Sequence, residues 1–289
     1  MRVVFLSIIL LLGISQSSYA EQVCGLGEND CQIELGEYNI ELPARSDPFV
    51  KIPAMIYFHG AGGSGQRSLK NREMVETFLK RGYAVIAPSG LKRPNSKFGP
   101  GWSFHPDRKK RRDELTFSKA VLEDAANKFN LDRENILMTG FSIGGSLTWY
   151  LAFQDPDVVK AFAPVAGSFW RPHPSAQDCA GPVKLHHTHG WVDGTVPLEG
   201  RPIGPVDNPR IVQGDVFYGL QLMRQVNGCK RLKADKFDTS GKFWKRWWTK
   251  CKPDSALQFN LFQGGHSVPK GWAEEAINWF EALDKPQEG

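Results

Sequence analysis

The sequence predicts an α/β fold in which a mostly parallel sheet is covered by helices on both faces. Short apolar, β-rich segments alternate along the chain with longer segments of helical periodicity, an order that is typical of such a sheet. The chain has 289 residues, of which 41% are hydrophobic and 23% charged, so a sizeable core is available and disorder is excluded as the main state. No repeat, low-complexity block or Pro/Ser-rich linker divides the sequence. Residues 21–289 are therefore expected to form a single domain.

Seven segments are rich in β-branched and aromatic residues and end in turn signals, which predicts strands. They cover residues 38–42, 52–58, 83–87, 136–139, 161–165, 183–187 and 257–262. Apolar residues recur with helical spacing in three longer segments, residues 115–129, 216–226 and 272–283. The strands and helices alternate over most of the chain, as a doubly covered sheet requires.

The first twenty residues are predicted to be a secretory signal peptide. Arg2 precedes an apolar run over residues 3–13, and residues 18–20 offer the small side chains that a signal peptidase recognises, with cleavage after Ala20. The apolar run is much shorter than the roughly 20 residues that span a bilayer, so no stable membrane insertion is expected. Removal of Arg2 lowers the formal net charge of +5 by one, and so small an excess does not imply a polyanionic partner. The mature protein is expected to be secreted or periplasmic.

Export changes how the five cysteines are interpreted, because thiols tend to pair in an oxidising compartment. Five is an odd number, so at least one cysteine stays unpaired within the chain. The closest spacings predict disulfides between Cys24 and Cys31 and between Cys229 and Cys251, which leaves Cys179 as the free thiol. No CxxC pair is present, so a zinc knuckle is not expected. No metal ligands are predicted among the site residues.

A tight turn between a strand and a helix is predicted at residues 140–145, GFSIGG. Strand 136–139 leads into this turn and a helix over residues 146–153 leaves it. The glycines remove Cβ atoms that would clash in so sharp a turn. In this context the G-x-S-x-G pattern is a nucleophile elbow, which holds the Ser142 hydroxyl clear of the sheet. The alternative is a helix N-cap without chemistry, because a bare G-x-S-x-G also occurs by chance.

Two later segments supply a carboxylate and an imidazole in loops that follow strands. Residues 189–197, HGWVDGTVP, place Asp193 in a turn, and residues 264–266, GGH, place His266 in the loop after the last strand. The chain order Ser142, Asp193, His266 is that of the α/β-hydrolases, whose fold it predicts.

The roles of these three residues follow from their chemistry. A serine hydroxyl is a weak nucleophile at neutral pH, so His266 would accept the Ser142 proton during attack and later return it to the leaving alcohol. Asp193 would hold the imidazole in the required tautomer and stabilise the imidazolium. Asp207 and Asp215 are alternative sources of this carboxylate.

The oxyanion hole is predicted at a glycine-rich loop. Residues 57–65, YFHGAGGSG, follow an apolar strand, and their glycines let the backbone come close to a substrate. We assign the hole to the backbone N–H groups of Ala61 and Ile143, with His59 steadying the loop through hydrogen bonds. A phosphate-binding loop is the competing interpretation, but no Gly-Lys-Ser/Thr follows, so no nucleotide cofactor is expected.

Taken together, these motifs resemble the polyhydroxybutyrate depolymerase-like esterases, a group that includes feruloyl and acetylxylan-type esterases. The resemblance covers residues 36–283 and is carried by residues 59–63, 140–145, 189–197, 227–229 with the later Cys251, and 264–269. It implies the α/β-hydrolase fold and the triad, and it implies a disulfide between Cys229 and Cys251. Ile143 stands where the family commonly has asparagine, but a backbone N–H donor does not depend on the side chain.

Three other features each have two interpretations. The basic run at residues 108–112 is either a solvated loop or a docking patch for an anionic substrate or envelope. Residues 230–252 combine basic and aromatic side chains, which is typical of a disulfide-tied strand or hairpin or of a nucleic-acid-binding surface. His187 and His189 share one face of a strand, either as hydrogen-bonded core histidines or as a metal pair.

The sequence therefore predicts an exported serine esterase that forms an acyl-enzyme and needs no cofactor. Its expected partner is an ester substrate, polymeric or soluble, and no nucleic acid. Short-chain, hydroxyalkanoate or hydroxycinnamoyl esters are expected, because aromatic side chains are predicted around the site. These are Trp102, Phe104, Trp170, Trp191 and Trp244. A prolyl oligopeptidase-like serine peptidase and a catalytically silent binding protein are the alternatives, and the oligomeric state stays open.

Overall fold

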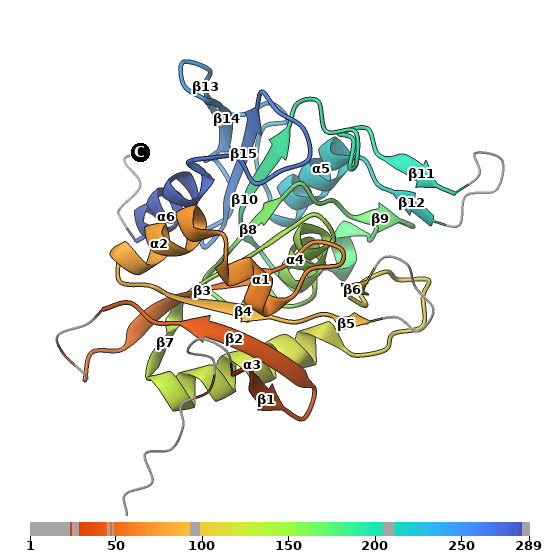
Figure 1. The fold of residues 1–289 in the computed structure, drawn as a ribbon. Helices are drawn as coiled ribbons and strands as arrows, with labels where there is room; N and C mark the ends of the chain where they lie inside the picture. The colour runs from red at the N-terminus through yellow and green to blue at the C-terminus, as the bar shows by residue number, and fades with distance from the viewer. Residues whose placement is uncertain are drawn as a thin grey trace, which may run out of the picture.

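A ten-stranded sheet forms the centre of the computed structural model, which describes residue 24 and residues 29–44, 47, 49–92, 99–204 and 211–284 (Figure 1). In spatial order its strands are β1 (Cys31–Ile33), β2 (Gly36–Glu41), β4 (Ala84–Pro88), β3 (Ile52–Phe58), β7 (Leu131–Phe141), β8 (Ala161–Val165), β10 (Lys184–Gly190), β15 (Ala256–Phe262), β14 (Phe243–Trp248) and β13 (Lys236–Asp238). Neighbouring strands from β4 to β15 run parallel, and the outer pairs at both edges are antiparallel. All seven predicted strands are present, and the predicted α/β-hydrolase architecture is confirmed. The predicted signal peptide, residues 1–20, lies outside the described residues.

Helices cover both faces of the sheet (Figure 1). One hydrophobic cluster joins the sheet to α3 (Glu114–Phe129), α4 (Ile143–Gln154) and α5 (Val216–Val226), and a second joins it to α2 (Arg72–Lys80) and α6 (Trp272–Ala282). β3 illustrates how one strand serves both clusters, since Ile56 and Phe58 pack in the first and Met55 and Tyr57 in the second. Such alternation is the period-two pattern of a strand that is buried on both faces.

The helical segment between β3 and β4 was not among the predicted elements. It comprises the short α1 (Gly65–Leu69) and α2, which begins at the N-cap Asn71. α2 buries Met74, Val75 and Phe78, which recur at helical spacing along one face of the helix. The sequence therefore carries a helical pattern here, which the prediction overlooked.

Short strands outside the main sheet line its carboxyl edge. β9 (Trp170–Arg171), β12 (Ile211–Gln213) and β11 (Arg201–Ile203) form a three-stranded antiparallel sheet, and β5 (Leu91–Lys92) pairs with β6 (Pro100–Gly101). A single turn of 3₁₀ helix, Ala176–Asp178, follows β9. Residues 230–252 contain β13 and β14, so the strand or hairpin interpretation of that segment is confirmed.

Both predicted disulfides are present in the structure. Cys24 is bonded to Cys31 at the start of β1, and Cys229 is bonded to Cys251, which joins the end of α5 to the end of β14. Cys179 is free and half-buried, and burial raises the pKa of its thiol. Within the described ranges, no helix is long and apolar enough to cross a membrane.

Candidate active site

Ser142 occupies the tight turn between β7 and α4. Its φ of 59° lies in the left-handed region, which a non-glycine residue seldom adopts. The glycines after it are needed because the backbone packs so closely here: a Cβ on Gly144 would lie 2.1 Å from the Phe58 carbonyl oxygen, and one on Gly145 would lie 2.4 Å from that of Val165. The turn therefore has the geometry of a nucleophile elbow.

The structure brings the three predicted triad residues into one hydrogen-bonded chain. His266 Nε2 lies 2.8 Å from Ser142 Oγ, and His266 Nδ1 lies 2.7 Å from Asp193 Oδ2. Ser142 is 8% exposed and Asp193 5% exposed. The imidazole can thus accept the Ser142 proton on one nitrogen while the other donates to a carboxylate.

The other carboxylate oxygen of Asp193 accepts hydrogen bonds from the turn in which the residue lies. The backbone N–H groups of Thr195 and Val196 donate to Asp193 Oδ1 at 2.9 Å and 2.8 Å. Burial alone would raise the pKa of Asp193, but the hydrogen bonds from His266 and Val196 outweigh burial, and the pKa lies below its usual 3.8. The carboxylate is therefore ionised at neutral pH and can stabilise an imidazolium.

The two alternative carboxylates do not join this chain of hydrogen bonds. Asp215 caps α5 instead, because its Oδ1 accepts the N–H groups of Phe217 and Tyr218. Asp207 lies outside the described residues. Asp193 is thus the described carboxylate that contacts His266.

His187 and His189 are buried side by side on β10, and His189 lies next to Asp193. His187 Nδ1 lies 3.1 Å from the Pro164 carbonyl oxygen, the two rings meet at 3.0 Å, and His189 Nε2 lies 2.7 Å from the Val196 carbonyl oxygen. His189 Nε2 is also 3.5 Å from Asp193 Oδ2. Burial lowers the pKa of both imidazoles. In the described part of the chain, no group of three or more His, Cys, Asp or Glu is arranged to hold a metal ion.

The predicted oxyanion loop is fixed by its own backbone. The Gly62 N–H donates to the Pro100 carbonyl at 2.9 Å, and the Gly63 N–H bonds back within the loop. Ala61, just before them, is exposed. Ile143 is the first residue of α4, where no earlier turn of the helix accepts its N–H. Ala61 and Ile143 are therefore the N–H groups that we propose as donors to an oxyanion.

His59 supports this loop through three hydrogen bonds. The Gly90 N–H donates to His59 Nε2 at 2.9 Å, so the ring proton lies on Nδ1, which is 2.7 Å from the Gly60 carbonyl oxygen. The Trp102 indole N–H donates to the His59 carbonyl at 2.8 Å. Burial lowers the pKa of His59, so the neutral ring that these contacts require is favoured.

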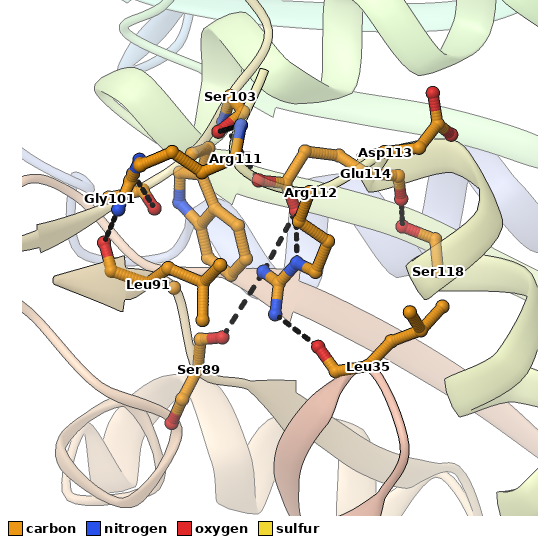
Figure 2. A network of polar contacts seen from close by, with 12 residues as sticks. Leu35, Ser89, Leu91, Gly101, Ser103, Arg111, Arg112, Asp113, Glu114 and Ser118 are labelled. Atoms are coloured by element: carbon orange, nitrogen blue, oxygen red, sulfur yellow. Dashed lines mark hydrogen bonds and ion pairs between the residues drawn. The ribbon is translucent and has the colours of Figure 1, made fainter. Parts of the chain in front are cut away.

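The basic run at residues 108–112 is not solvated throughout, because its last residue, Arg112, is buried. Arg112 and Glu114 form an ion pair of 2.8 Å in which each side chain is 3% exposed. The Arg112 guanidinium also donates to the carbonyl groups of Leu35 and Ser89 (Figure 2). Burial lowers the pKa of Arg112 and raises that of Glu114. The charge pattern alone does not reveal this burial, because the run looks equally polar throughout.

This buried pair anchors the segment that packs against the oxyanion loop. Glu114 Oε1 accepts the Ser103 N–H at 2.8 Å, and the neighbouring Arg111 donates to the carbonyl groups of Leu91 and Gly101 (Figure 2). A Cβ on Gly101 would lie only 3.0 Å from the Ile143 side chain. Arg111, Arg112 and Glu114 therefore hold the segment around Gly101 and Ser103 next to Ile143. The sequence did not predict this supporting role.

Three of the five aromatic residues expected around the site belong to the core instead. Trp102, Phe104 and Trp170 are 1%, 9% and 6% exposed. The Trp102 ring packs on His59, and the Phe104 ring packs on Trp170 and Tyr150. Trp191 is 54% exposed and lies with its ring centroid 6.3 Å from that of Trp244. Of the predicted set, only Trp191 is exposed, and Trp244 is partly buried beside it.

Comparison with known proteins places this site in a family. Residues 42–199, more than half of the chain, match the dienelactone hydrolase family. The putative esterase NocK of Nocardia uniformis subsp. tsuyamanensis is 26% identical over 76% of this chain and 66% of its own length. The probable feruloyl esterase C of Aspergillus niger is 22% identical over 92% of this chain and 91% of its own length.

Solved structures show the same fold. The acetyl xylan esterase from Aspergillus awamori superimposes with a TM-score of 0.63 at 16% sequence identity, covering 85% of this chain and 93% of that one. The Bacillus cereus carboxylesterase gives a TM-score of 0.54 over 86% and 94% of the two chains. The resemblance to feruloyl esterases is confirmed by these relatives, whereas likeness to polyhydroxybutyrate depolymerases stays a prediction. The chain belongs to the dienelactone hydrolase family and has the α/β-hydrolase fold of esterases.

Proposed function

We propose that the protein is an exported serine esterase that hydrolyses carboxylic esters through an acyl-enzyme. The observation that carries this proposal is the unbroken hydrogen-bonded chain from Ser142 through His266 to Asp193 at a nucleophile elbow. The names of the relatives, which include esterase, feruloyl esterase and acetyl xylan esterase, support the same reaction.

The geometry assigns each residue one step. Ser142 Oγ attacks the ester carbonyl while His266 Nε2 takes its proton, and Asp193 stabilises the resulting imidazolium. The negative charge that develops on the carbonyl oxygen would be held by the N–H groups of Ala61 and Ile143. His266 then protonates the leaving alcohol. Water activated by the same imidazole releases the acid and restores Ser142.

The proposed substrates are short-chain and hydroxycinnamoyl esters, free or attached to a polymer. Trp191, two residues before Asp193, is exposed and its ring lies next to that of the partly buried Trp244, so a flat acyl or sugar group can stack on it. The names of the fungal relatives point to the same classes of ester. Amides are expected to react more slowly, because amines leave less readily than alcohols.

The nucleophile is tested by labelling with a fluorophosphonate probe and by hydrolysis of 4-nitrophenyl acetate. Ser142→Ala should abolish labelling and lower turnover on the order of a thousandfold or more, with an unchanged circular dichroism spectrum. Ser240→Ala, an exposed serine in the β13–β14 hairpin, should label and turn over like the wild type. Near wild-type turnover by Ser142→Ala would remove the triad assignment. Failure of the wild type to label would favour a catalytically silent binding protein. Equal cleavage of peptides and esters would favour a peptidase.

Export and domain structure belong to the same proposal. Cleavage after Ala20 would release residues 21–289 as one domain into an oxidising compartment, which suits the two disulfides. N-terminal sequencing of the protein from its native host should begin at Glu21. An N-terminus at Met1 in the mature protein would contradict export by this signal.

A further inference from the structure

A cavity of about 330 Å³ lies between β14, β15 and α6. We call it the α6 cavity. Its volume is in the range of sites that hold small ligands. Its wall includes Lys245 and Trp247 from β14, Gln258 from β15, and Glu275 and Trp279 from α6.

The α6 cavity and the proposed active site lie at opposite ends of β15. The triad residue His266 follows the carboxyl end of this strand, whereas the cavity is lined by residues 255–258 at its start. A strand rises about 3.3 Å per residue, so Leu257 and Phe262 are roughly 16 Å apart. A small ligand in the α6 cavity would therefore leave the triad accessible, and the cavity is a second candidate site.

Two tryptophan side chains give the α6 cavity flat apolar surface. Trp247 and Trp279 are both partly buried, so each keeps part of its surface open. The Trp279 ring stacks on that of His186, with centroids 5.3 Å apart and an interplanar angle of 27°. This contact holds the indole in place. Such rings offer a ligand a large contact area.

The polar groups of the wall are balanced in charge. Lys245 Nζ and Glu275 Oε2 form an ion pair of 2.6 Å that joins β14 to α6. Among the residues that the structure describes, these are the two charged side chains of the lining. The uncharged polar residues of the lining are Thr249, Ser255, Gln258 and Asn278. The wall therefore offers both donors and acceptors but no unpaired charge.

Buried polar atoms without partners lie next to this wall. Gln258 is 4% exposed, and its Nε2 donates to Asn260 Oδ1 at 2.9 Å, which leaves its carbonyl oxygen for a donor in the cavity. Asn260 Nδ2 and both ring nitrogens of His186 have no hydrogen-bond partner within the described ranges. His186 pairs with Gln258 across the sheet. Buried polar groups of this kind need an explanation such as a bound water or ligand.

We propose that the α6 cavity binds a sugar ring of a neutral polysaccharide. A sugar ring has an apolar C–H face that stacks on an indole, and its hydroxyl groups both donate and accept hydrogen bonds. A nucleotide would also stack, but its phosphate needs a free cation, and Lys245 is paired with Glu275. The site would hold a polymer while ester groups elsewhere on it reach Ser142. The binding itself does not depend on the esterase function proposed above.

Calorimetry with oligosaccharides that carry no ester group tests the site without turnover. Xylohexaose, cellohexaose and mannohexaose are titrated into the wild type, and at least one of them should bind. Trp247→Ala should weaken that affinity on the order of tenfold or more, the effect expected when a tryptophan anchor is truncated. Trp247→Phe keeps a ring and should lose less. In the ¹⁵N-labelled wild type, the indole N–H signals of Trp247 and Trp279 should shift on binding.

Phe237→Ala is the matched control. Phe237 is a 72% exposed aromatic residue on β13, the strand that pairs with β14, but it is not among the residues that line the α6 cavity. This variant should bind like the wild type. Binding of none of the three oligosaccharides, or equal losses in Phe237→Ala and Trp247→Ala, would overturn the sugar site. So would loss of binding in Trp191→Ala but not in Trp247→Ala, because the oligosaccharide would then occupy the active site.

A charged chain tests the class of sugar. Hexagalacturonate, which carries a carboxylate on each ring, should bind more weakly than the best neutral hexamer, because the wall has no unpaired cation to meet it. Tighter binding of hexagalacturonate would contradict the assignment to neutral polysaccharides.

Hydrolysis of 4-nitrophenyl acetate separates this site from the proposed function. Trp247→Ala should keep the wild-type kcat and KM for this small ester, because Trp247 lies at the far end of β15 from the triad. A protein that binds an oligosaccharide through Trp247 but does not hydrolyse esters would retain the sugar site and lose the esterase proposal. A protein that hydrolyses esters through Ser142 but binds none of the oligosaccharides would do the reverse.

Discussion

Asp193 shows how one side chain is set up by its surroundings. One oxygen accepts two backbone N–H groups and the other faces His266, and His189 lies on the far side at 3.5 Å. Each of these donors favours the ionised carboxylate against the cost of burial. The residue is therefore preorganised before any substrate binds.

We expect Asp193→Asn to lower kcat for 4-nitrophenyl acetate by roughly 10⁴-fold. The asparagine N–H group can face His266 Nδ1, which then accepts instead of donating, so the ring proton moves to Nε2 and blocks proton transfer from Ser142. Asp215→Asn is the control, because asparagine caps a helix as well as aspartate does and α5 should be unaffected. Wild-type kcat in Asp193→Asn would show that another carboxylate orients His266.

At the scale of elements, the Arg112–Glu114 pair joins three parts of the chain. It connects the start of α3 with the loop before β2 and with the segment that supports the oxyanion loop. The Arg112 guanidinium also lies 3.5 Å from the centre of the Phe117 ring. Removing one charge would leave the other buried without a partner, which is more costly than losing the pair.

Arg112→Met should therefore lower the free energy of unfolding by about 3–5 kcal/mol, measured by urea denaturation. The double variant Arg112→Met/Glu114→Leu should recover much of this loss, since apolar side chains replace both buried charges. Lys80→Met breaks an ion pair in which the lysine side chain is 78% exposed, and should cost about 1 kcal/mol at most. If Arg112→Met cost no more than Lys80→Met, the buried pair would have no structural importance.

At the scale of the whole molecule, buried imidazoles couple stability to pH. Burial is the largest cause of a lowered pKa for five of the seven histidines, which are His59, His173, His186, His187 and His189. For His186, which stacks on Trp279, the pKa falls from 6.5 to about 3. Below pH 6.5 these histidines are protonated in the unfolded chain but stay neutral in the folded chain, so acid favours unfolding.

The free energy of unfolding should fall as the pH is lowered from 6.5 toward 3. His186 alone should lower the free energy of unfolding by roughly 2 kcal/mol at pH 5, because each pH unit below 6.5 costs about 1.4 kcal/mol for a group that stays neutral when folded. The raised pKa of Glu114 acts in the opposite direction, but it is a single group. Urea midpoints at pH 7.5 and pH 5 for the wild type and His186→Phe test this. The variant should lose less stability between the two pH values, and an unchanged difference would contradict the argument.

The sequence by itself determined the features that depend on neighbours in the chain. The apolar runs predict the strands, since a segment buried on both faces needs apolar side chains at successive positions. The glycines around Ser142 predict the elbow, because no larger residue fits so close to the backbone of β3 and β8. The order of Ser142, Asp193 and His266 predicts the fold, and the spacing of the cysteines predicts both disulfides.

The tertiary structure decided which of these side chains are buried and what they contact. Arg112 looks like one charge in a basic run, yet it is buried, because Leu35 and Ser89 from two distant segments meet it beside its chain neighbour Glu114. Trp102 and Trp170 look like substrate contacts, yet they pack in the core. Burial depends on segments that lie far apart in the sequence and meet only when the sheet is assembled, so no local pattern reports it.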